Sequence, residues 1–321
     1  MNPVKIGVAG VGSMGFNHCK ILQMLKNVEF KGVYDIDLKR SENVAKTFAV
    51  QAFSSYNELL NAVDAVIIAV KTSHHFSLTL QAIQRGKHVL VEKPFVSSLK
   101  EAEQIIRSVD NGSVVVQVGH VERFNPALIQ LTKVINPDKL ISCEARRFGV
   151  PNRNIDTDVI LDLMIHDIDI ILALVNSPLS TVSGVGHYNE DGKQIEAASA
   201  LLSFQNGCFA SLISSRFSLE KTRSLYVTEK SRFLKTNLLT KELYIYHKSN
   251  ISPFDNHSCY LENIVEKVMI PYGEALSLEL QHFLMAIESQ QPPTVGVHEA
   301  FKVLEVALNI KDQIEKNRNR K

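Results

Sequence analysis

The stretch Val8-Ala-Gly-Val-Gly-Ser-Met-Gly15 decides the fold of this chain. Its three glycines form the pattern G-x-G-x-x-G. The short apolar run before it, Val4–Ala9, is typical of a buried parallel strand, and Met14–Leu25 after it has apolar residues at helical spacing. A strand, a glycine-rich turn and a helix in this order are the phosphate-binding start of a doubly wound α/β sheet. The stretch therefore predicts a dinucleotide-binding domain of the Rossmann type.

Each glycine of this pattern has a separate physical reason. Gly10 permits a tight turn, Gly12 lets a pyrophosphate approach the backbone, and Gly15 lets the helix pack closely on the strand. The first N–H groups of the helix then face the phosphates at the positive end of the helix dipole. The alternative is a flexible loop that merely contains glycines, which the flanking strand and helix disfavour. We expect five residues to contact the cofactor here: Gly10, Gly12, Ser13, Met14 and Gly15.

An acidic residue follows the second predicted strand, Val28–Tyr34. Asp35 lies about 20 positions past the glycine pattern, where a carboxylate binds the ribose hydroxyls of the cofactor, and Asp37 is the second choice. A carboxylate there repels a 2′-phosphate, so the sequence favours NAD over NADP. Lys39 and Arg40 come shortly after and offer positive charge to a 2′-phosphate, which keeps NADP as the alternative.

Strands and helices continue to alternate up to about residue 120. This alternation predicts right-handed βαβ units and one parallel, doubly wound sheet for residues 1–120. The expected helices are Ser41–Phe48, Tyr56–Asn61, Phe76–Arg85 and Leu99–Val109, and the expected strands are Ala52–Phe53, Asp64–Val70, His88–Val91 and Val114–Val118.

Three polar segments follow strands of this sheet: Lys71–His75, Glu92–Pro94 and Gly119–Asn125. Ligands of such sheets bind beyond the carboxyl ends of the strands, so we expect these segments around one crevice. A lysine at a strand end, held by the next proline, can stabilise an alkoxide or orient a hydroxyl. The alternative is a lysine that ends the strand and points into water. Further expected cofactor contacts are Thr72, His75, Glu92 and Lys93.

The pattern changes in residues 121–321, where short strands follow one another and Asn206-Gly207 is typical of a hairpin turn. We expect a substrate-binding α+β domain with a mostly antiparallel sheet, and a last helix that packs back on the first domain. The expected strands are Lys139–Phe148, Thr181–Tyr188, Glu196–Phe204, Cys208–Phe217, Ser224–Thr228 and Leu243–Tyr246, with helices at Leu276–Ile287 and His298–Ile314.

A strongly apolar helix is predicted at Asp158–Val175, with Asp158 as its N-cap. Its polar residues Asp162, His166 and Asp169 are four and three residues apart, which places them along one face. A histidine next to an acid is suited to take the proton of a hydroxyl that is being oxidised. The alternatives are the wet side of a surface helix and a metal site. No H-E-x-x-H or cysteine cluster supports the metal site, so we expect none.

The whole-chain composition narrows the classes of function. A chain of 321 residues suits two domains, and a net charge of +1 gives no electrostatic case for nucleic acid or a membrane surface. No apolar run approaches the roughly 18–20 residues of a membrane span. The first strand begins too early to leave room for a signal peptide, and four scattered cysteines fit a reducing compartment. We therefore expect a cytoplasmic protein.

Three motifs together resemble the Gfo/Idh/MocA oxidoreductases, which are relatives of glucose–fructose oxidoreductase and inositol dehydrogenase. They are Gly10–Gly15, the string Gly86-Lys-His-Val-Leu-Val-Glu-Lys-Pro94, and Asp162-x-x-x-His166. The resemblance implies an NAD(P)-dependent dehydrogenase that acts on CH–OH groups. It departs from the family at Lys71, where many members have proline, so the contact of Lys71 with the cofactor stays open.

The resemblance also implies a catalytic group and an assembly. His166 would act as the base, Lys93 as the cation that orients the hydroxyl, and Asp162 as the residue that orients the substrate or the histidine; Asp169 is expected to be structural. In the family the antiparallel sheet is large and open, and it pairs with a second subunit. This implies a homodimer or a homotetramer.

Within the family, Gly119–Pro126 and Leu161–Asp169 look most like the UDP-N-acetylglucosamine 3-dehydrogenases. That likeness implies oxidation of a sugar 3-hydroxyl to a ketone, which an aminotransferase then converts to an amine, as in lipid A biosynthesis. The alternatives are a dehydrogenase of a free sugar or polyol such as an inositol, and a non-catalytic sensor that binds NAD(H). Arginine suits the pyrophosphate of a nucleotide sugar. The expected substrate-binding residues are Arg123, Asn125, Arg146 and Arg147, with Arg153 less firmly placed.

Overall fold

Two compact units make up the chain. The first unit comprises residues 1–121 and 274–305, and the second comprises residues 122–273 and 306–321. The computed structural model describes residues 3–110, 112–150, 157–248, 251–255, 258–261 and 264–318. The segment 274–305, which sequence analysis grouped with the second domain, belongs to the first unit.

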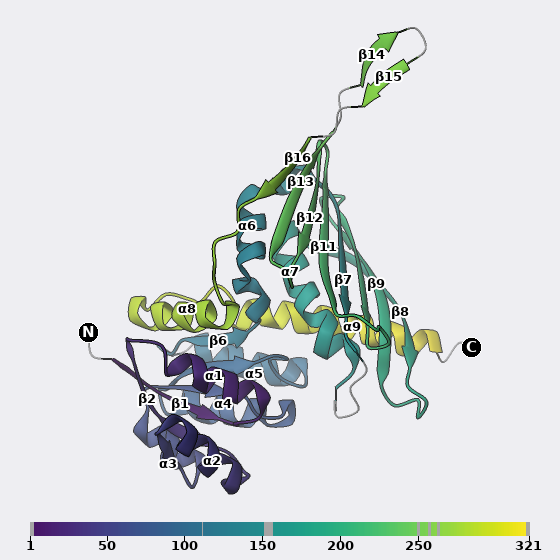
Figure 1. Cartoon of the computed structure of the whole chain (residues 1–321). Helices are drawn as coiled ribbons and strands as arrows, with labels where there is room; N and C mark the ends of the chain where they lie inside the picture. The colour runs from purple at the N-terminus through teal and green to yellow at the C-terminus, as the bar shows by residue number, and fades with distance from the viewer. Residues whose placement is uncertain are drawn as a thin grey trace. The chain divides into compact units, whose positions relative to one another are not determined.

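The first unit, whose strands β1, β2 and β6 are labelled in Figure 1, contains a sheet of six parallel strands. Their order is β3-β2-β1-β4-β5-β6. The strand order reverses between β1 and β4, and such a reversal is where α/β sheets bind ligands. The predicted parallel, doubly wound sheet is confirmed. Its strands are β1 (Val4–Ala9), β2 (Val28–Tyr34), β3 (Gln51–Ala52), β4 (Ala65–Ile68), β5 (His88–Glu92) and β6 (Val116–Gly119).

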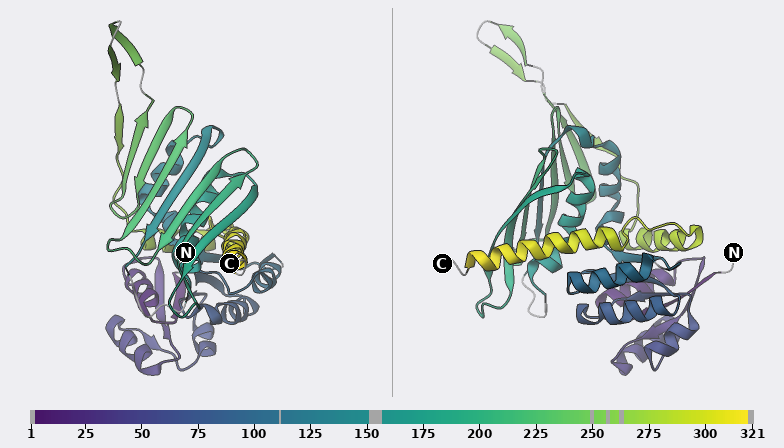
Figure 2. Two further views of the ribbon diagram at one scale, coloured as in Figure 1. Left: turned by 90° about the vertical axis from the view of Figure 1, so that its right-hand side faces the viewer. Right: turned by 180° about the vertical axis from the view of Figure 1, so that it is seen from behind.

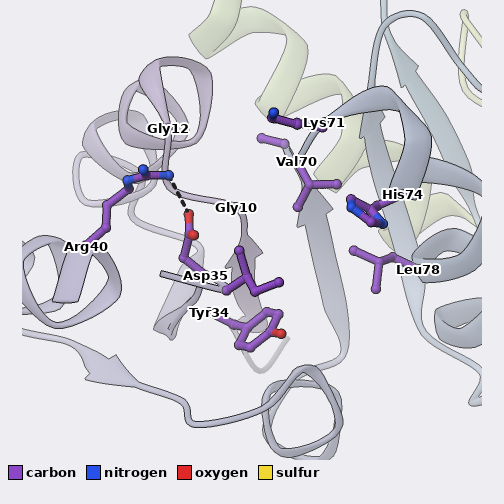
Figure 3. A pocket seen from close by; sticks show the side chains of 11 residues that line it. Gly10, Gly12, Tyr34, Asp35, Arg40, Val70, Lys71, His74 and Leu78 are labelled. Atoms are coloured by element: carbon purple, nitrogen blue, oxygen red, sulfur yellow. Dashed lines mark ion pairs between the residues drawn. The ribbon is translucent and has the colours of Figure 1, made fainter. Parts of the chain in front are cut away.

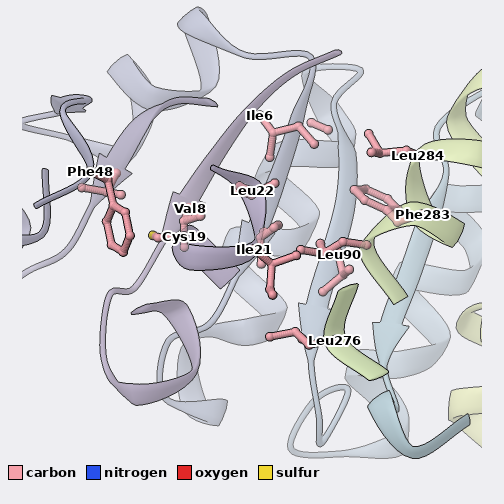
Figure 4. Close-up of a cluster of buried hydrophobic side chains, with 14 of the residues drawn as sticks. Ile6, Val8, Cys19, Ile21, Leu22, Phe48, Leu90, Leu276, Phe283 and Leu284 are labelled. Atoms are coloured by element: carbon pink, nitrogen blue, oxygen red, sulfur yellow. The ribbon is translucent and has the colours of Figure 1, made fainter. Parts of the chain in front are cut away.

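The helices of this unit pack their apolar sides on the sheet. Figure 4 shows Ile6 of β1 and Leu22 of α1 in the same buried cluster as Leu284 and the fully buried Phe283 of α8. Helix α8, far away in the sequence, therefore covers the same face of the sheet as α1. The helices are α1 (Ser13–Leu22), α2 (Leu38–Phe48), α3 (Tyr56–Ala62), α4 (His75–Gln84), α5 (Leu99–Asp110), α8 (Ala275–Ser289) and the short η1 (Thr72–His74), and α9 (Val297–Arg318) runs through both units.

Side-chain caps decide where two of these helices begin. Helix α2 starts at Leu38 rather than at the expected Ser41, because the Asp37 carboxylate accepts a hydrogen bond from the backbone N–H of Arg40. Helix α5 starts where it was expected. There the Ser98 hydroxyl accepts from Glu101 N–H, and the Glu101 carboxylate accepts from Ser98 N–H.

The second unit contains an eight-stranded sheet in the order β16-β13-β12-β11-β7-β10-β9-β8 (Figure 2). Neighbouring strands are antiparallel except for β7 and β10. The expected hairpin is confirmed, with Gly207 at φ +85° between β9 and β10. The strands are β7 (Leu140–Phe148), β8 (Leu179–Tyr188), β9 (Ile195–Phe204), β10 (Phe209–Ser215), β11 (Thr222–Glu229), β12 (Arg232–Asn237), β13 (Glu242–His247) and β16 (Val265–Val268), with β14 (Ile251–Asp255) and β15 (Ser258–Leu261) forming a separate pair.

Helices α6 (Pro126–Val134) and α7 (Ile165–Val175) pack on this sheet, α6 against β12 and β13 and α7 against β7 and β10. Sequence analysis missed α6 and the strands β12, β14, β15 and β16. It also expected one regular helix over Asp158–Val175. The structure instead has a π-helical turn, η4 (Ile160–Met164), directly before α7. Two short 3₁₀ helices, η2 (Val121–Phe124) and η3 (Pro137–Lys139), precede β7.

In the part of the chain that the structure describes, no helix combines the length and the apolar character that a bilayer crossing requires.

Candidate active site

A cavity of about 420 Å³ lies at the carboxyl ends of β1, β2 and β4 in the first unit. Figure 3 shows its side chains, with the glycine loop and Asp35 on one side and the segment after β4 on the other. The lining residues are Gly10, Gly12, Tyr34, Asp35, Ile36, Arg40, Ala69, Val70, Lys71, His74 and Leu78.

The glycine loop of this cavity fits a dinucleotide. Gly10 has φ +86°, and a Cβ on Gly15 would lie only 1.9 Å from the Gly10 carbonyl oxygen. In contrast, a Cβ on Gly12 would meet no atom within 4 Å. Gly12 is the N-cap of α1 and, as a glycine, has no side chain that could cap the helix. Ser13 and Met14 are exposed in the first turn. The loop thus offers open space and helix N–H groups to a pyrophosphate.

The Asp35 carboxylate is fixed at the edge of the cavity. Its Oδ2 accepts from Val11 N–H at 2.8 Å, and its Oδ1 accepts from Asp37 N–H at 2.9 Å. Arg40 lies between the two acids, with Nη1 3.6 Å from Asp35 Oδ2 and Nη2 3.3 Å from Asp37 Oδ2. Two carboxylates face one guanidinium, so the edge that would meet a 2′-phosphate remains negative. This arrangement favours NAD.

Replacing Asp35 by serine should shift the preference from NADH toward NADPH. The substitution removes the negative charge and releases Arg40 to pair with a 2′-phosphate. We expect the ratio of the two dissociation constants, measured by cofactor fluorescence, to change by about tenfold or more, which corresponds to about 1.4 kcal/mol. Asp64→Ser is a matched control, because Asp64 precedes β4 and accepts a backbone hydrogen bond from Lys5. An unchanged ratio in Asp35→Ser would contradict the role of Asp35.

Glu92, the residue before Lys93, is held in place by a side chain of α1. His18 of α1 is fully buried, and its Nε2 lies 2.7 Å from Glu92 Oε1. The other oxygen, Oε2, accepts from the backbone N–H of Lys93 at 3.3 Å. A Cβ on Gly119 of β6 would lie 3.1 Å from this same Oε2, so a glycine at this position avoids a close contact with the carboxylate. Lys93 is half-buried and joined to Pro94 by a cis peptide bond. Sequence analysis missed His18.

His75 does not line the cavity, although sequence analysis expected it to contact the cofactor. Its ring is buried, with Nδ1 2.9 Å from the Pro94 carbonyl oxygen and Nε2 3.1 Å from the Val70 carbonyl oxygen. Burial lowers the pKa of His75 below its usual value, although these carbonyls act in the opposite direction. His75 thus joins the segments that follow β4 and β5. Its neighbour His74 lines the cavity instead, and Thr72 is half-buried in η1.

In the second unit, three acids on the segment of η4 and α7 each face an arginine from another element. His166, which is half-buried, lies on the same segment, and the three ion pairs tie this segment to other elements. The pairs are Asp162 with Arg216 at 3.0 Å, Asp167 with Arg147 at 2.8 Å, and Asp169 with Arg123 at 3.2 Å.

Arg147 lies at the buried centre of this arrangement, with its side chain 2% exposed. It donates to both oxygens of Asp167 and, at 2.8 Å, to Glu122 of η2. Arg223 of β11 also donates to Glu122 at 3.0 Å. Burial would raise the pKa of Glu122, but the two guanidinium groups lower it below its usual 4.5. Internal acids occupy the guanidinium of Arg147, so the structure shows a buried ion-pair role for this residue in place of the expected substrate contact.

Asn125 also has an internal role in place of the expected substrate contact. Its side-chain oxygen accepts from Ala127 N–H at 3.1 Å and so caps α6, where Pro126 occupies the first turn. Its amide nitrogen donates to Glu122 and to the Leu238 carbonyl oxygen, each at 3.0 Å. Asn125 is 5% exposed, so it has little surface left for a ligand.

Arg146 and Arg147 are adjacent on β7 and therefore point to opposite faces of the sheet. Arg147 faces α7, whereas Arg146 is exposed, donates to Glu144 at 2.7 Å and lies over the ring of Tyr226. Arg153 lies outside the described residues. Among the residues that the structure describes, no group of three or more His, Cys, Asp or Glu side chains is placed to hold a metal ion.

Known proteins resemble this chain over its whole length. The UDP-N-acetylglucosamine 3-dehydrogenase of Acidithiobacillus ferrooxidans is 31% identical over 97% of each chain. The chain belongs to the Gfo/Idh/MocA family. Models of this family match residues 4–120 as an oxidoreductase with an NAD-binding Rossmann fold and residues 100–230 as the GFO/IDH/MocA C-terminal domain. The scyllo-inositol 2-dehydrogenase (NAD(+)) of Bacillus subtilis is 27% identical and aligns with 95% of this chain and 92% of its own.

Two solved structures have the same fold as this chain. The structure of the Acidithiobacillus ferrooxidans enzyme matches with a TM-score of 0.89 and covers 98% of this chain and 99% of its own. A levoglucosan dehydrogenase in complex with NADH and levoglucosan matches with a TM-score of 0.85 at 17% identity. The protein is therefore an NAD-binding dehydrogenase that acts on CH–OH groups, as its Gfo/Idh/MocA relatives are.

Proposed function

We propose that this protein oxidises the 3-hydroxyl of UDP-N-acetylglucosamine to a ketone. The observation that carries the proposal is the 31% identity to a UDP-N-acetylglucosamine 3-dehydrogenase, with 97% of both chains aligned. The runner-up is oxidation of a free polyol, since a scyllo-inositol dehydrogenase aligns with 95% of the chain at 27% identity.

The proposed chemistry gives separate roles to His166, Lys93 and Asp162. When NAD is bound, it supplies the acceptor for the hydride that leaves the sugar carbon. His166 takes the hydroxyl proton as general base, and the ammonium group of Lys93 stabilises the negative charge that develops on the oxygen. Asp162 orients the substrate hydroxyl or the His166 ring.

The candidates for substrate contact are the arginines that lie outside the buried ion pairs of Arg147. Arg123 is partly exposed and remains our candidate for the pyrophosphate, although its Nε also faces Asp169. Arg146 is more exposed, but it lies on the face of the sheet opposite α7. A ligand on the α7 side would therefore meet Arg123 rather than Arg146.

The open sheet face supports a second proposal, assembly with another copy of the chain. Large apolar side chains share the face that carries Arg146, and each is more than a third exposed. They are Val185, Leu201, Phe209 and Phe233. Light scattering of the purified protein tests this assembly, and a monomer at micromolar concentration would contradict it.

Turnover of a substrate panel tests the proposed function. UDP-N-acetylglucosamine, UDP-glucose, scyllo-inositol and glucose 6-phosphate are each incubated with NAD, and NADH formation is followed. We expect the highest kcat/KM with UDP-N-acetylglucosamine, by about tenfold or more, because a site that binds the nucleotide and the N-acetyl group leaves polar groups unpaired with the other substrates.

Mass spectrometry should show that the product has lost two hydrogen atoms. Faster turnover of scyllo-inositol would replace the proposal with the polyol activity. NADH binding without turnover of any substrate in the panel would contradict both activities and favour a protein that only binds the cofactor.

A further inference from the structure

Arg216, a residue that sequence analysis did not single out, contacts the proposed active-site acid Asp162. Its Nη2 lies 3.0 Å from Asp162 Oδ2 and 2.6 Å from the carbonyl oxygen of Thr157. The Arg216 side chain is 5% exposed, whereas that of Asp162 is 22% exposed. The guanidinium therefore approaches the carboxylate from the protein interior and leaves part of Asp162 open to solvent.

The sheet holds Arg216 in place. The residue directly follows β10, and its backbone N–H donates to the Glu196 carbonyl oxygen of β9 at 3.0 Å. The carbonyl oxygen of the preceding Ser215 accepts from Gly149 N–H at 2.8 Å, next to the end of β7. Backbone hydrogen bonds of Arg216 and Ser215 thus tie this position to β9 and to the residue that follows β7.

The other end of the contact is fixed at the start of η4. Asp158 caps this segment by accepting from Ile160 N–H at 3.1 Å and Leu161 N–H at 3.0 Å. Lys311 of α9 lies 2.9 Å from the same carboxylate, and this pairing raises the pKa of Lys311 above its usual value even though burial lowers it. The Asp158 contacts therefore hold the start of η4 in place. Arg216 adds a further contact four residues later, at Asp162.

Asp162 lies inside the π-helical turn. A π turn is wider than an α turn, and such turns occur mostly as single insertions, often at functional sites. The regular spacing of an α-helix therefore does not fix where Asp162 points relative to His166. A partner outside the helix has to do so, and a guanidinium is suited to this because it stays charged and its donors have a fixed geometry.

We propose that Arg216 is a positioning residue for the reaction: it holds the Asp162 carboxylate in one orientation, so that Asp162 can orient the substrate hydroxyl or the His166 ring. This inference rests on the proposed function, specifically on the role of Asp162.

The variants Arg216→Gln and Arg216→Lys test the inference. In Arg216→Gln we expect kcat to fall about a hundredfold, because the acid loses its fixed orientation, while the dissociation constant of NADH stays close to that of the wild type. Arg216→Lys should recover part of the loss, since it restores the charge but not the fork of donors.

Arg232→Gln is the matched control in the same unit. Arg232 also pairs with one carboxylate and one carbonyl oxygen, Glu229 at 2.7 Å and Val134 at 2.8 Å, but it lies on β12. This variant should lower the melting temperature and leave kcat within about twofold of the wild type. A loss of kcat in Arg216→Gln that is no larger than in Arg232→Gln overturns the inference.

A double-mutant cycle with Asp162→Asn distinguishes the role of Asp162 in the reaction from the role of Arg216 in positioning it. We expect the effects of Asp162→Asn and Arg216→Gln on kcat to be strongly non-additive. Wild-type kcat in Asp162→Asn overturns the proposed role of Asp162. An impaired Asp162→Asn together with an unimpaired Arg216→Gln overturns only the inference about Arg216. The cycle uses whichever substrate the panel identifies, and absence of turnover on the whole panel overturns both.

Discussion

The variant Lys93→Met should lose about three orders of magnitude in kcat. Methionine keeps most of the length of the side chain but has no ammonium group to stabilise negative charge on the substrate oxygen. His18 and Glu92 remain in place and still fix the end of β5, so we expect NADH affinity to change far less than kcat. Steady-state kinetics and a fluorescence titration with NADH measure the two effects separately.

Lys87→Met is the control, because Lys87 precedes the other end of β5 and donates to the Val63 carbonyl oxygen at 2.8 Å. It should affect stability but not kcat. His166→Ala should lower kcat by about a hundredfold or more, the usual contribution of a general base. If Lys93→Met and His166→Ala both keep wild-type activity, the catalytic assignment is wrong.

The variant Arg147→Met should destabilise the second unit by about 3–5 kcal/mol, the usual result of removing one member of a buried ion pair. Methionine fills most of the volume but leaves Asp167 and Glu122 buried without their shared guanidinium. Denaturant unfolding followed by circular dichroism measures the effect. Arg146→Met, on the neighbouring exposed position, should change the free energy of unfolding by no more than about 0.5 kcal/mol.

The pH dependence gives this prediction a sign. The pKa of Glu122 in the folded protein lies below its usual 4.5. Its stabilising contribution is therefore complete above that value and is lost as the pH falls through the lowered folded pKa. Arg147→Met removes one cause of the lowering, so the stability difference from the wild type should shrink as the solution is acidified below about pH 5. A difference that stays constant down to pH 3 would contradict the ion-pair explanation.

The sequence predicted the parts of the site that depend on local geometry. The glycine pattern requires a positive φ at Gly10 and close contact at Gly15, and both requirements act within a few residues. Asp35 was predictable because it directly follows the neighbouring strand β2, and its carboxylate accepts from Val11 N–H in the glycine loop. The alternation of strands and helices is also a local pattern, and it was enough to predict the parallel sheet.

The missed contacts depend on which segments meet in space. His18 meets Glu92 across 74 positions and Arg216 meets Asp162 across 54, and nothing local in the sequence marks these pairs. Arg146 and Arg147 are chemically the same, so only the pleat of β7 decides which one is buried. For α6 there was a signal that we did not use: Asn125 followed by Pro126 is a typical helix start.

The His18–Glu92 contact also fixes the number of residues between the glycine loop and His18. Gly12 begins α1 at the predicted phosphate site, Gly15 touches the strand, and His18 comes three residues later on the same helix. Each added or deleted residue turns an α-helix by about 100°. One insertion between Gly15 and His18 would therefore swing the imidazole away from Glu92. The glycine signature of this chain is thus longer than its phosphate-binding part: it runs as G-x-G-x-x-G-x-x-H, and its histidine contacts Glu92, the last residue of β5.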